Sequence, residues 1–136
     1  MRYDDQKLQS FDRNKRALAR RERFDADIFF FMTASNNIAT LSILGKGPVF
    51  TTSSGAQGFN GARRGTMSAF FAVGVAIAER AKSLGIQRVR IIVTGLSKSR
   101  LGAFRGLLFG GVTVASLHER TPRAHNGCRP PARRRL

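Results

Sequence analysis

The feature that most constrains the fold is a helical pattern from Thr66 to Leu84, with strand-like segments on both sides of it. The apolar residues that recur at the spacing of one helix face are Phe70, Val73, Ile77, Ala81 and Leu84. Gly85 follows where a helix C-cap glycine belongs. Residues on the other faces, including Phe71 and Val75, are also apolar, so we expect this helix to lie between a sheet and further protein surface.

Segments rich in strand formers surround the helix and predict the remaining elements. Three precede it, at residues 27–33, 38–44 and 49–52, separated by asparagine-containing and glycine-containing turns. A strand at 88–94, a second helix at 98–109 and a last strand at 112–117 follow it, and Leu101, Phe104 and Leu108 share one face of the second helix. The order βββαβαβ predicts a single α/β domain with a mixed five-stranded sheet and two helices, because strand-helix-strand units pair their strands in parallel.

The charge of the chain indicates the class of partner. Its 136 residues contain 24 Lys plus Arg against 8 Asp plus Glu, a formal net charge of +16. A positive charge of this size favours binding to a polyanion, because Lys and Arg side chains that bind phosphates release condensed counterions. An anionic membrane is the competing polyanion, but the longest nearly apolar run, 67–78, is too short to span a bilayer. We therefore predict a nucleic-acid partner and no membrane.

The charge is unevenly distributed and predicts three regions. Residues 1–24 carry eight basic and four acidic side chains and form a basic N-terminal extension. Residues 25–119 contain most of the apolar content and form the α/β RNA-binding domain. Residues 120–136 contain six arginines, three prolines and no carboxylate, and form an extended C-terminal tail.

Two loops that lead into helices have the composition of anion-binding segments. In the glycine-rich loop, residues 53–65, glycines allow backbone N–H groups to approach phosphates, and Arg63 and Arg64 add formal charge. Phe59 in this loop is available to stack on an exposed base or to pack against the core. The second loop, residues 94–100, places Lys98 and Arg100 near a helix start, where cations oppose the helix dipole unless an anion is present. A solvated surface loop is the alternative interpretation of each.

Catalysis and metal binding have little support in the sequence. Metal-dependent hydrolysis needs clustered carboxylates, and the body has only four acidic residues, which no motif brings together. His125 and Cys128 lie on the arginine-rich tail without an orienting group, and a lone His-x-x-Cys is inadequate for zinc. We predict no catalytic residue, no metal, no cofactor and no small-molecule substrate. The protein is expected not to be an enzyme.

Two motifs give a specific resemblance. His-Asn-Gly-Cys-Arg-Pro-Pro at 125–131, followed by Ala-Arg-Arg-Arg-Leu, is similar to the C-terminal signature of the small ribosomal subunit protein eleven family of bacteria and organelles. Gly-Phe-Asn-Gly-Ala-Arg-Arg-Gly-Thr at 58–66 resembles that family's Gly-Phe-x-Gly-x-Arg-Lys-x-Thr loop. The resemblance covers residues 27–136. In the second loop, where the family has Gly-Pro-Gly-x-Gly-Arg, only Gly95 and Arg100 are kept.

The resemblance implies a ribonuclease-H-like sheet and a structural role in translation. It implies contacts with small-subunit ribosomal RNA at the platform near the messenger exit, and neighbouring platform proteins as partners. The phenylalanine-rich first strand and the unmatched extension favour a mitochondrial ribosome, with plastid and bacterial ribosomes as alternatives. The residues expected to contact RNA are Phe59, Arg63, Arg64, Lys98, Arg100, Arg123, His125, Asn126, Arg129, Arg133, Arg134 and Arg135. A non-ribosomal RNA- or DNA-binding module is the alternative function.

Overall fold

The computed structural model of the chain describes residues 24–132. The elements are β1 (Ala26–Met32), β2 (Asn37–Ile43), β3 (Gly47–Ser53), a short 3-10 helix η1 (Gly61–Gly65), α2 (Met67–Ser83), β4 (Arg88–Thr94), α3 (Arg100–Phe109) and β5 (Thr113–Glu119). Apart from η1, which was not predicted, these are the elements expected from the sequence. The second helix begins two residues later than expected, and the last strand ends two residues later.

The five strands form one mixed sheet in the order β3-β2-β1-β4-β5. The pairs β1–β2 and β2–β3 are antiparallel, whereas β1–β4 and β4–β5 are parallel. The predicted α/β fold with a mixed five-stranded sheet is therefore confirmed. Because β1, β3, β4 and β5 run in the same direction, their C-terminal ends share one edge of the sheet, which we call the C-terminal edge.

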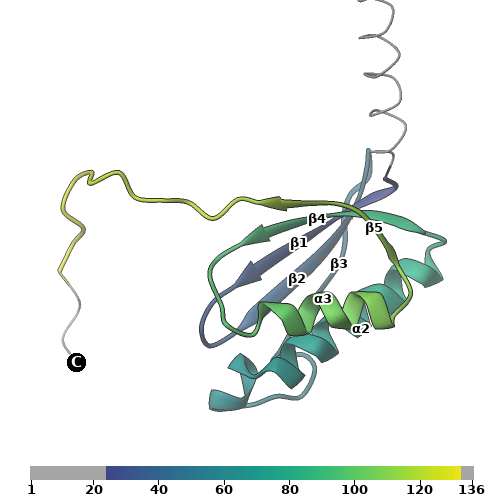
Figure 1. Cartoon of the computed structure of the whole chain (residues 1–136), viewed down its shortest axis with the longest axis horizontal. Coiled ribbons are helices and arrows are strands. Elements are labelled where there is room, and N and C mark those ends of the chain that lie inside the picture. The colour runs from purple at the N-terminus through teal and green to yellow at the C-terminus, as the bar shows by residue number, and fades with distance from the viewer. Residues whose placement is uncertain (1–23, 133–136) are drawn as a thin grey trace, which may run out of the picture.

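Both helices cover the same face of the sheet (Figure 1). Helix α2 packs against the sheet through Phe70, Val73 and Ile77, which are fully buried with Phe30 of β1 and Leu41 of β2. The predicted core face of this helix is thus confirmed up to Ala81. Leu84 was expected in the core but is 38% exposed, because it occupies the C-cap, where the chain turns away.

Helix α3 packs in a way that its sequence did not predict. Leu101 and Leu108, expected on its buried face, are 55% and 63% exposed, and Phe104 is half-buried with its ring edge-on to Phe30. The residues that α3 buries are Gly102, Ala103, Gly106 and Leu107. A β-carbon at Gly106 would lie 2.3 Å from the carbonyl oxygen of Phe71 in α2. Small residues allow the backbones of α2 and α3 to come into contact. The face of α3 that is buried is therefore determined by the small size of its residues rather than by their hydrophobicity.

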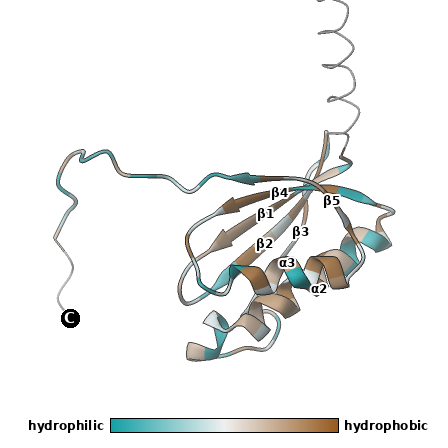
Figure 2. Cartoon of the chain, viewed as in Figure 1, coloured by the Kyte–Doolittle hydropathy of each residue, from teal (hydrophilic) through white to brown (hydrophobic). Residues whose placement is uncertain are grey.

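The opposite face of the sheet, which we call the open face, is covered by neither helix. Phe29 and Phe31 of β1 and Ile38 of β2 point to this side and are 39%, 52% and 37% exposed. Figure 2 shows that β1 and much of β4 are hydrophobic, with residues of both faces of the sheet contributing to the colour. No helix within residues 24–132 has the length and apolar character required to cross a membrane.

Candidate nucleic-acid interface

The glycine-rich loop, the second loop and the tail all leave the sheet at the C-terminal edge. Hydrogen bonds between side-chain hydroxyls and backbone groups connect these segments. The hydroxyl of Ser99 donates to the carbonyl oxygen of Gly65 at 2.8 Å, and the N–H of Gly95 donates to the hydroxyl of Thr121 at 3.0 Å. A β-carbon at Gly65 would lie 2.5 Å from the carbonyl oxygen of Ala34, in the loop after β1. Segments from four parts of the sequence therefore form one continuous rim.

The backbone N–H groups in the first half of the glycine-rich loop are hydrogen-bonded within the loop itself. The N–H groups of residues 57, 58 and 59 donate to carbonyl oxygens of residues 53, 55 and 54, and the N–H of Ala56 donates to the Ser53 hydroxyl. These donors are satisfied inside the loop, so they cannot also hold a phosphate. The backbone-cradle interpretation is wrong for this part of the loop. What the loop presents outward is side chains.

Arg63 and Arg64 have different environments within the loop. The Nε of Arg64 donates to the carbonyl oxygen of Phe59 at 3.1 Å, and its guanidinium lies against Gly55, so Arg64 closes the loop over itself. Arg63 is exposed, and its side chain has no hydrogen bond or ion pair to any residue of the described range. A hollow of about 350 Å³ is lined by Gln57, Gly58, Phe59, Asn60 and Arg63. The ring of Phe59 and the guanidinium of Arg63 thus both line a hollow on the surface of the loop.

The loop continues directly into α2 through a satisfied N-cap. The Thr66 hydroxyl accepts from the N–H of Ala69 at 3.3 Å and donates to the carbonyl oxygen of Arg63 at 2.7 Å. The capping residue holds the backbone of Arg63 in place. The helix therefore fixes the position from which the Arg63 side chain projects.

A carboxylate from another part of this chain neutralises a cation of the second loop. Arg100 forms an ion pair with Glu119 at the end of β5, and the hydroxyl of Thr121 also donates to that carboxylate. The anion expected beside the start of α3 is thus Glu119, a residue of this chain. Arg100 is therefore less available to RNA than Lys98, which is exposed and unengaged among the described residues.

Gly95, the glycine of the family motif that this loop keeps, packs closely against the backbone at the end of β1. It has a φ of 100°, and a β-carbon there would lie 1.9 Å from the carbonyl oxygen of Met32. The second loop therefore packs tightly against the end of β1 through this one glycine. The substituted positions 96–99 do not make this contact.

The carboxyl group of Glu119 gives the rim a pH dependence. The hydrogen bond from Arg100, followed by that from Thr121, holds the pKa of this carboxyl below its ordinary value. A carboxyl whose pKa is lowered on folding adds stability above its unfolded pKa and loses it as pH falls through the folded value. We expect Glu119→Gln to melt at a lower temperature than the wild type at pH 7, and the difference to shrink as pH falls through the ordinary pKa of a glutamate, about 4.3, toward the lower pKa of the folded protein. A difference that stays constant in thermal melts between about pH 7 and about pH 3 would contradict this role.

The tail leaves the rim as an extended and exposed chain (Figure 1). The N–H of Arg120 still donates to the carbonyl oxygen of Val93 at 2.8 Å, after which no backbone hydrogen bond is made up to residue 132. Arg123, His125 and Arg129 are exposed, and Asn126 is exposed with a φ of 60°. The predicted contacts Arg133, Arg134 and Arg135, like residues 1–23 of the extension, lie outside the described residues.

Two acidic residues of the body, Asp25 and Asp27, are hydrogen-bonded to other groups of the fold. Asp27 holds Arg90 through two hydrogen bonds of 2.7 Å. Asp25 accepts from the N–H groups of Gln87 and Arg88. Among the described residues, no group of three or more His, Cys, Asp and Glu side chains is placed to hold a metal ion.

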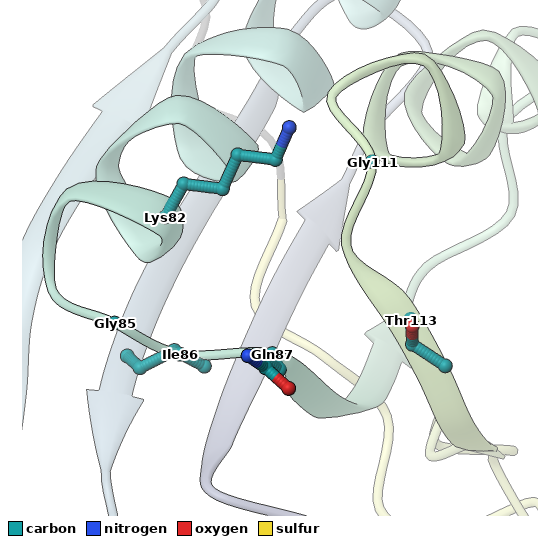
Figure 3. Close-up of a pocket in the computed structure, with 6 residues that line it drawn as sticks. All are labelled: Lys82, Gly85, Ile86, Gln87, Gly111 and Thr113. Atoms are coloured by element: carbon teal, nitrogen blue, oxygen red, sulfur yellow. The ribbon is translucent and has the colours of Figure 1, made fainter.

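A second hollow, which the sequence did not indicate, lies at the other end of the sheet (Figure 3). It has a volume of about 390 Å³ and is lined by Lys82, Gly85, Ile86, Gln87, Gly111 and Thr113. Lys82 at the end of α2 is its one cationic side chain, and the carbonyl end of that helix disfavours anions. This hollow is therefore separate from the basic rim.

Comparison with known proteins identifies a family for most of the chain. Residues 28–135 match the family model described as Ribosomal protein S11. The chain is 44% identical to the bovine small ribosomal subunit protein uS11m over 89 residues, which are 65% of this chain and 45% of that protein. It is 41% identical to uS11c of Pelargonium hortorum over 101 residues, 74% of this chain and 72% of that protein.

A bacterial relative and a length difference complete the comparison. The chain is 36% identical to uS11 of Acaryochloris marina over 104 residues, 76% of this chain and 80% of that protein. The match covers about half the length of the mammalian relatives, with 45% for the bovine protein and 44% for the mouse protein. The family model includes the glycine-rich loop, both helices and the tail. The chain belongs to the ribosomal protein S11 family.

Proposed function

We propose that the protein is a structural constituent of the small ribosomal subunit and binds its ribosomal RNA through the C-terminal edge of the sheet. The observation that carries this proposal is the convergence of the glycine-rich loop, the second loop and the tail on that edge. Each brings exposed cations: Arg63 from the first, Lys98 from the second, and Arg123 and Arg129 from the third. A structural rather than catalytic role follows.

The location within the cell and the subunit is also a proposal. The bovine and mouse relatives are named as mitochondrial proteins of the small subunit, which supports a mitochondrial ribosome for this chain, with plastid and bacterial ribosomes as alternatives. The family resemblance further implies the platform near the messenger exit and neighbouring platform proteins. The division into an extension (1–24), an RNA-binding domain (25–119) and a tail (120–136) belongs to the same proposal.

The contacts divide by their physical role. Arg63, Lys98 and the tail arginines bind phosphates, which positions the protein on RNA without reading its sequence. Arg64 stabilises the loop and presents its remaining guanidinium N–H groups to RNA. Phe59 and the hollow beside it accommodate an unstacked base. Arg100 strengthens the rim through Glu119 and contributes to RNA binding by its charge.

Replacing Arg63 tests the phosphate contact of the loop. Because the Arg63 side chain has no partner within residues 24–132, Arg63→Ala should leave the melting temperature unchanged and weaken RNA binding by about tenfold near 0.1 M salt. The slope of log K against log salt should become shallower by about 0.7 to 0.9. The measurement is a salt titration of the full chain on a fragment of small-subunit ribosomal RNA.

The matched control is Arg105→Ala, an exposed arginine on α3 away from the rim. It removes the same charge from the protein but no proposed contact, so its salt slope should equal that of the wild type. An equal weakening of binding in the two variants would show that overall charge, rather than the loop, determines binding.

A further inference from the structure

The open face of the sheet carries two exposed aromatic rings in a row. Phe29 lies between Thr40 of β2 and Ile92 of β4, and Phe31 lies between Ile38 of β2 and Thr94 of β4. Two residues along a strand separate positions by about 7 Å, so each ring has its own space above the sheet. Exposed apolar side chains grouped on one face are typical of a binding surface.

The charges around these rings favour an anionic occupant. Asp27, the acidic residue of β1 on this face, is neutralised by Arg90, whose guanidinium also lies 4.2 Å from the ring centre of Phe24. Strand alternation places the exposed residues Arg88 and His118 on the same side, since His118 pairs with Ile92 in the register. Asp25, just before β1, is occupied by the backbone of residues 87 and 88. In the described part of the chain, this face therefore has an exposed arginine, Arg88, and no unengaged carboxylate.

The aromatic pair is continuous with the basic rim. Phe31 is one residue from the end of β1, and its partner Thr94 directly precedes Gly95 of the second loop. Arg120, at the root of the tail, is bonded to Val93 in the adjacent position of β4. From the C-terminal edge, Phe31 is therefore the first ring on the open face and Phe29 the next.

We propose that unpaired nucleotides of the bound RNA continue from the rim onto the open face and stack their bases on Phe31 and Phe29. The inference rests on the proposed function and adds that the RNA on the open face is single-stranded, since a duplex does not present base faces for stacking. Aromatic rings on a sheet flanked by cations stack bases without requiring a particular sequence. A protein partner would be expected to match Arg88 with a carboxylate of its own.

The test compares two variants in which phenylalanine is replaced by leucine, so that aromatic rings are removed but apolar side chains are retained. The full chain carrying Phe29→Leu and Phe31→Leu is titrated with a short single-stranded oligouridylate and with a duplex RNA of equal length. The matched control is Phe109→Leu, which removes a ring that is 76% exposed on α3, away from this face. The double variant should bind the single strand about tenfold more weakly for each ring removed, at an unchanged salt slope, while duplex binding and the control stay at wild-type values.

A second measurement does not depend on the variants folding. Oligouridylate containing 5-iodouridine is irradiated with the wild-type protein, and the cross-linked peptide is sequenced by mass spectrometry. Cross-links at Phe29 or Phe31 are expected. Cross-links confined to the loops and tail, or wild-type single-strand affinity in a folded double variant, would overturn the inference.

The outcomes separate this inference from the proposed function. If the double variant binds RNA normally but fails to join the small subunit, the open face is a protein interface and the inference is wrong, while RNA binding at the rim stands. If Arg63→Ala and removal of the tail leave RNA binding unchanged, the proposed function fails, whatever the cross-links show.

Discussion

Replacing Gly95 with alanine should lower the free energy of unfolding by about 3 kcal/mol or more, the largest effect expected from a single methyl group in this chain. Two costs combine at this position. The backbone has a φ of 100°, which an L side chain rarely adopts, and the new β-carbon would lie 1.9 Å from the carbonyl oxygen of Met32. Because that oxygen belongs to the central strand β1, either the strand or the second loop must move.

The movement should also be visible at the rim. The N–H of Gly95 donates to Thr121, and Thr121 contacts Glu119, so displacement of the loop releases the root of the tail. Denaturant unfolding measures the decrease in stability. Amide hydrogen exchange should be faster at residues 93–95 and 119–121 than in the wild type.

The control for Gly95 is Gly45→Ala in the turn between β2 and β3. Gly45 has a φ of 82°, but a β-carbon there meets no atom within 4 Å. The substitution isolates the backbone cost, about 1 to 2 kcal/mol. If both variants are destabilised equally, the close approach of the second loop to β1 contributes nothing.

Ending the chain after Thr121 should weaken RNA binding on the order of a thousandfold at about 0.1 M salt while leaving the core folded. The deletion removes five arginines, at positions 123, 129, 133, 134 and 135. Each RNA phosphate that the tail no longer neutralises makes the salt slope shallower by about 0.7 to 0.9. The described part of the deleted segment makes no hydrogen bond to the domain, so the melting temperature should not change.

The full-length chain with these five arginines changed to glutamine separates charge from length. Its salt slope should be as shallow as that of the truncated chain, because the phosphate contacts are electrostatic. It should also fail to assemble into the small subunit. Wild-type RNA affinity or normal incorporation of either variant would contradict the role assigned to the tail.

The type of each element, its place along the chain and the mixed character of the sheet could be predicted because they follow from local patterns. Alternation and β-branched residues define the strands, and the 3.6-residue period of Phe70, Val73 and Ile77 defines α2. The two helical crossovers, β3–α2–β4 and β4–α3–β5, then make β3, β4 and β5 run in the same direction, whereas the place of β1 between β2 and β4 does not follow from them. The convergence of loops and tail on one edge is a consequence of that topology.

Features that depend on contacts distant in sequence could not be predicted. The pairing of Arg100 with Glu119 joins residues 19 positions apart, and neither residue's sequence neighbours indicate the other. Their hydrophobicity predicted that Leu101 and Leu108 lie on the buried face of α3. The helix instead packs against α2 through Gly106, which leaves both leucines exposed. Internal hydrogen bonds of the glycine-rich loop likewise depend on its three-dimensional fold, so composition alone suggested a more open phosphate site.

Sedimentation of the full chain through a sucrose gradient tests the central proposal most directly. A lysate of the source cells at moderate salt is fractionated, and the protein is detected alongside small-subunit ribosomal RNA. We expect it to migrate with the small subunit and the assembled ribosome, and the chain ending after Thr121 to remain at the top. A full-length protein found only in the soluble fractions would contradict the ribosomal assignment and favour a free nucleic-acid-binding module.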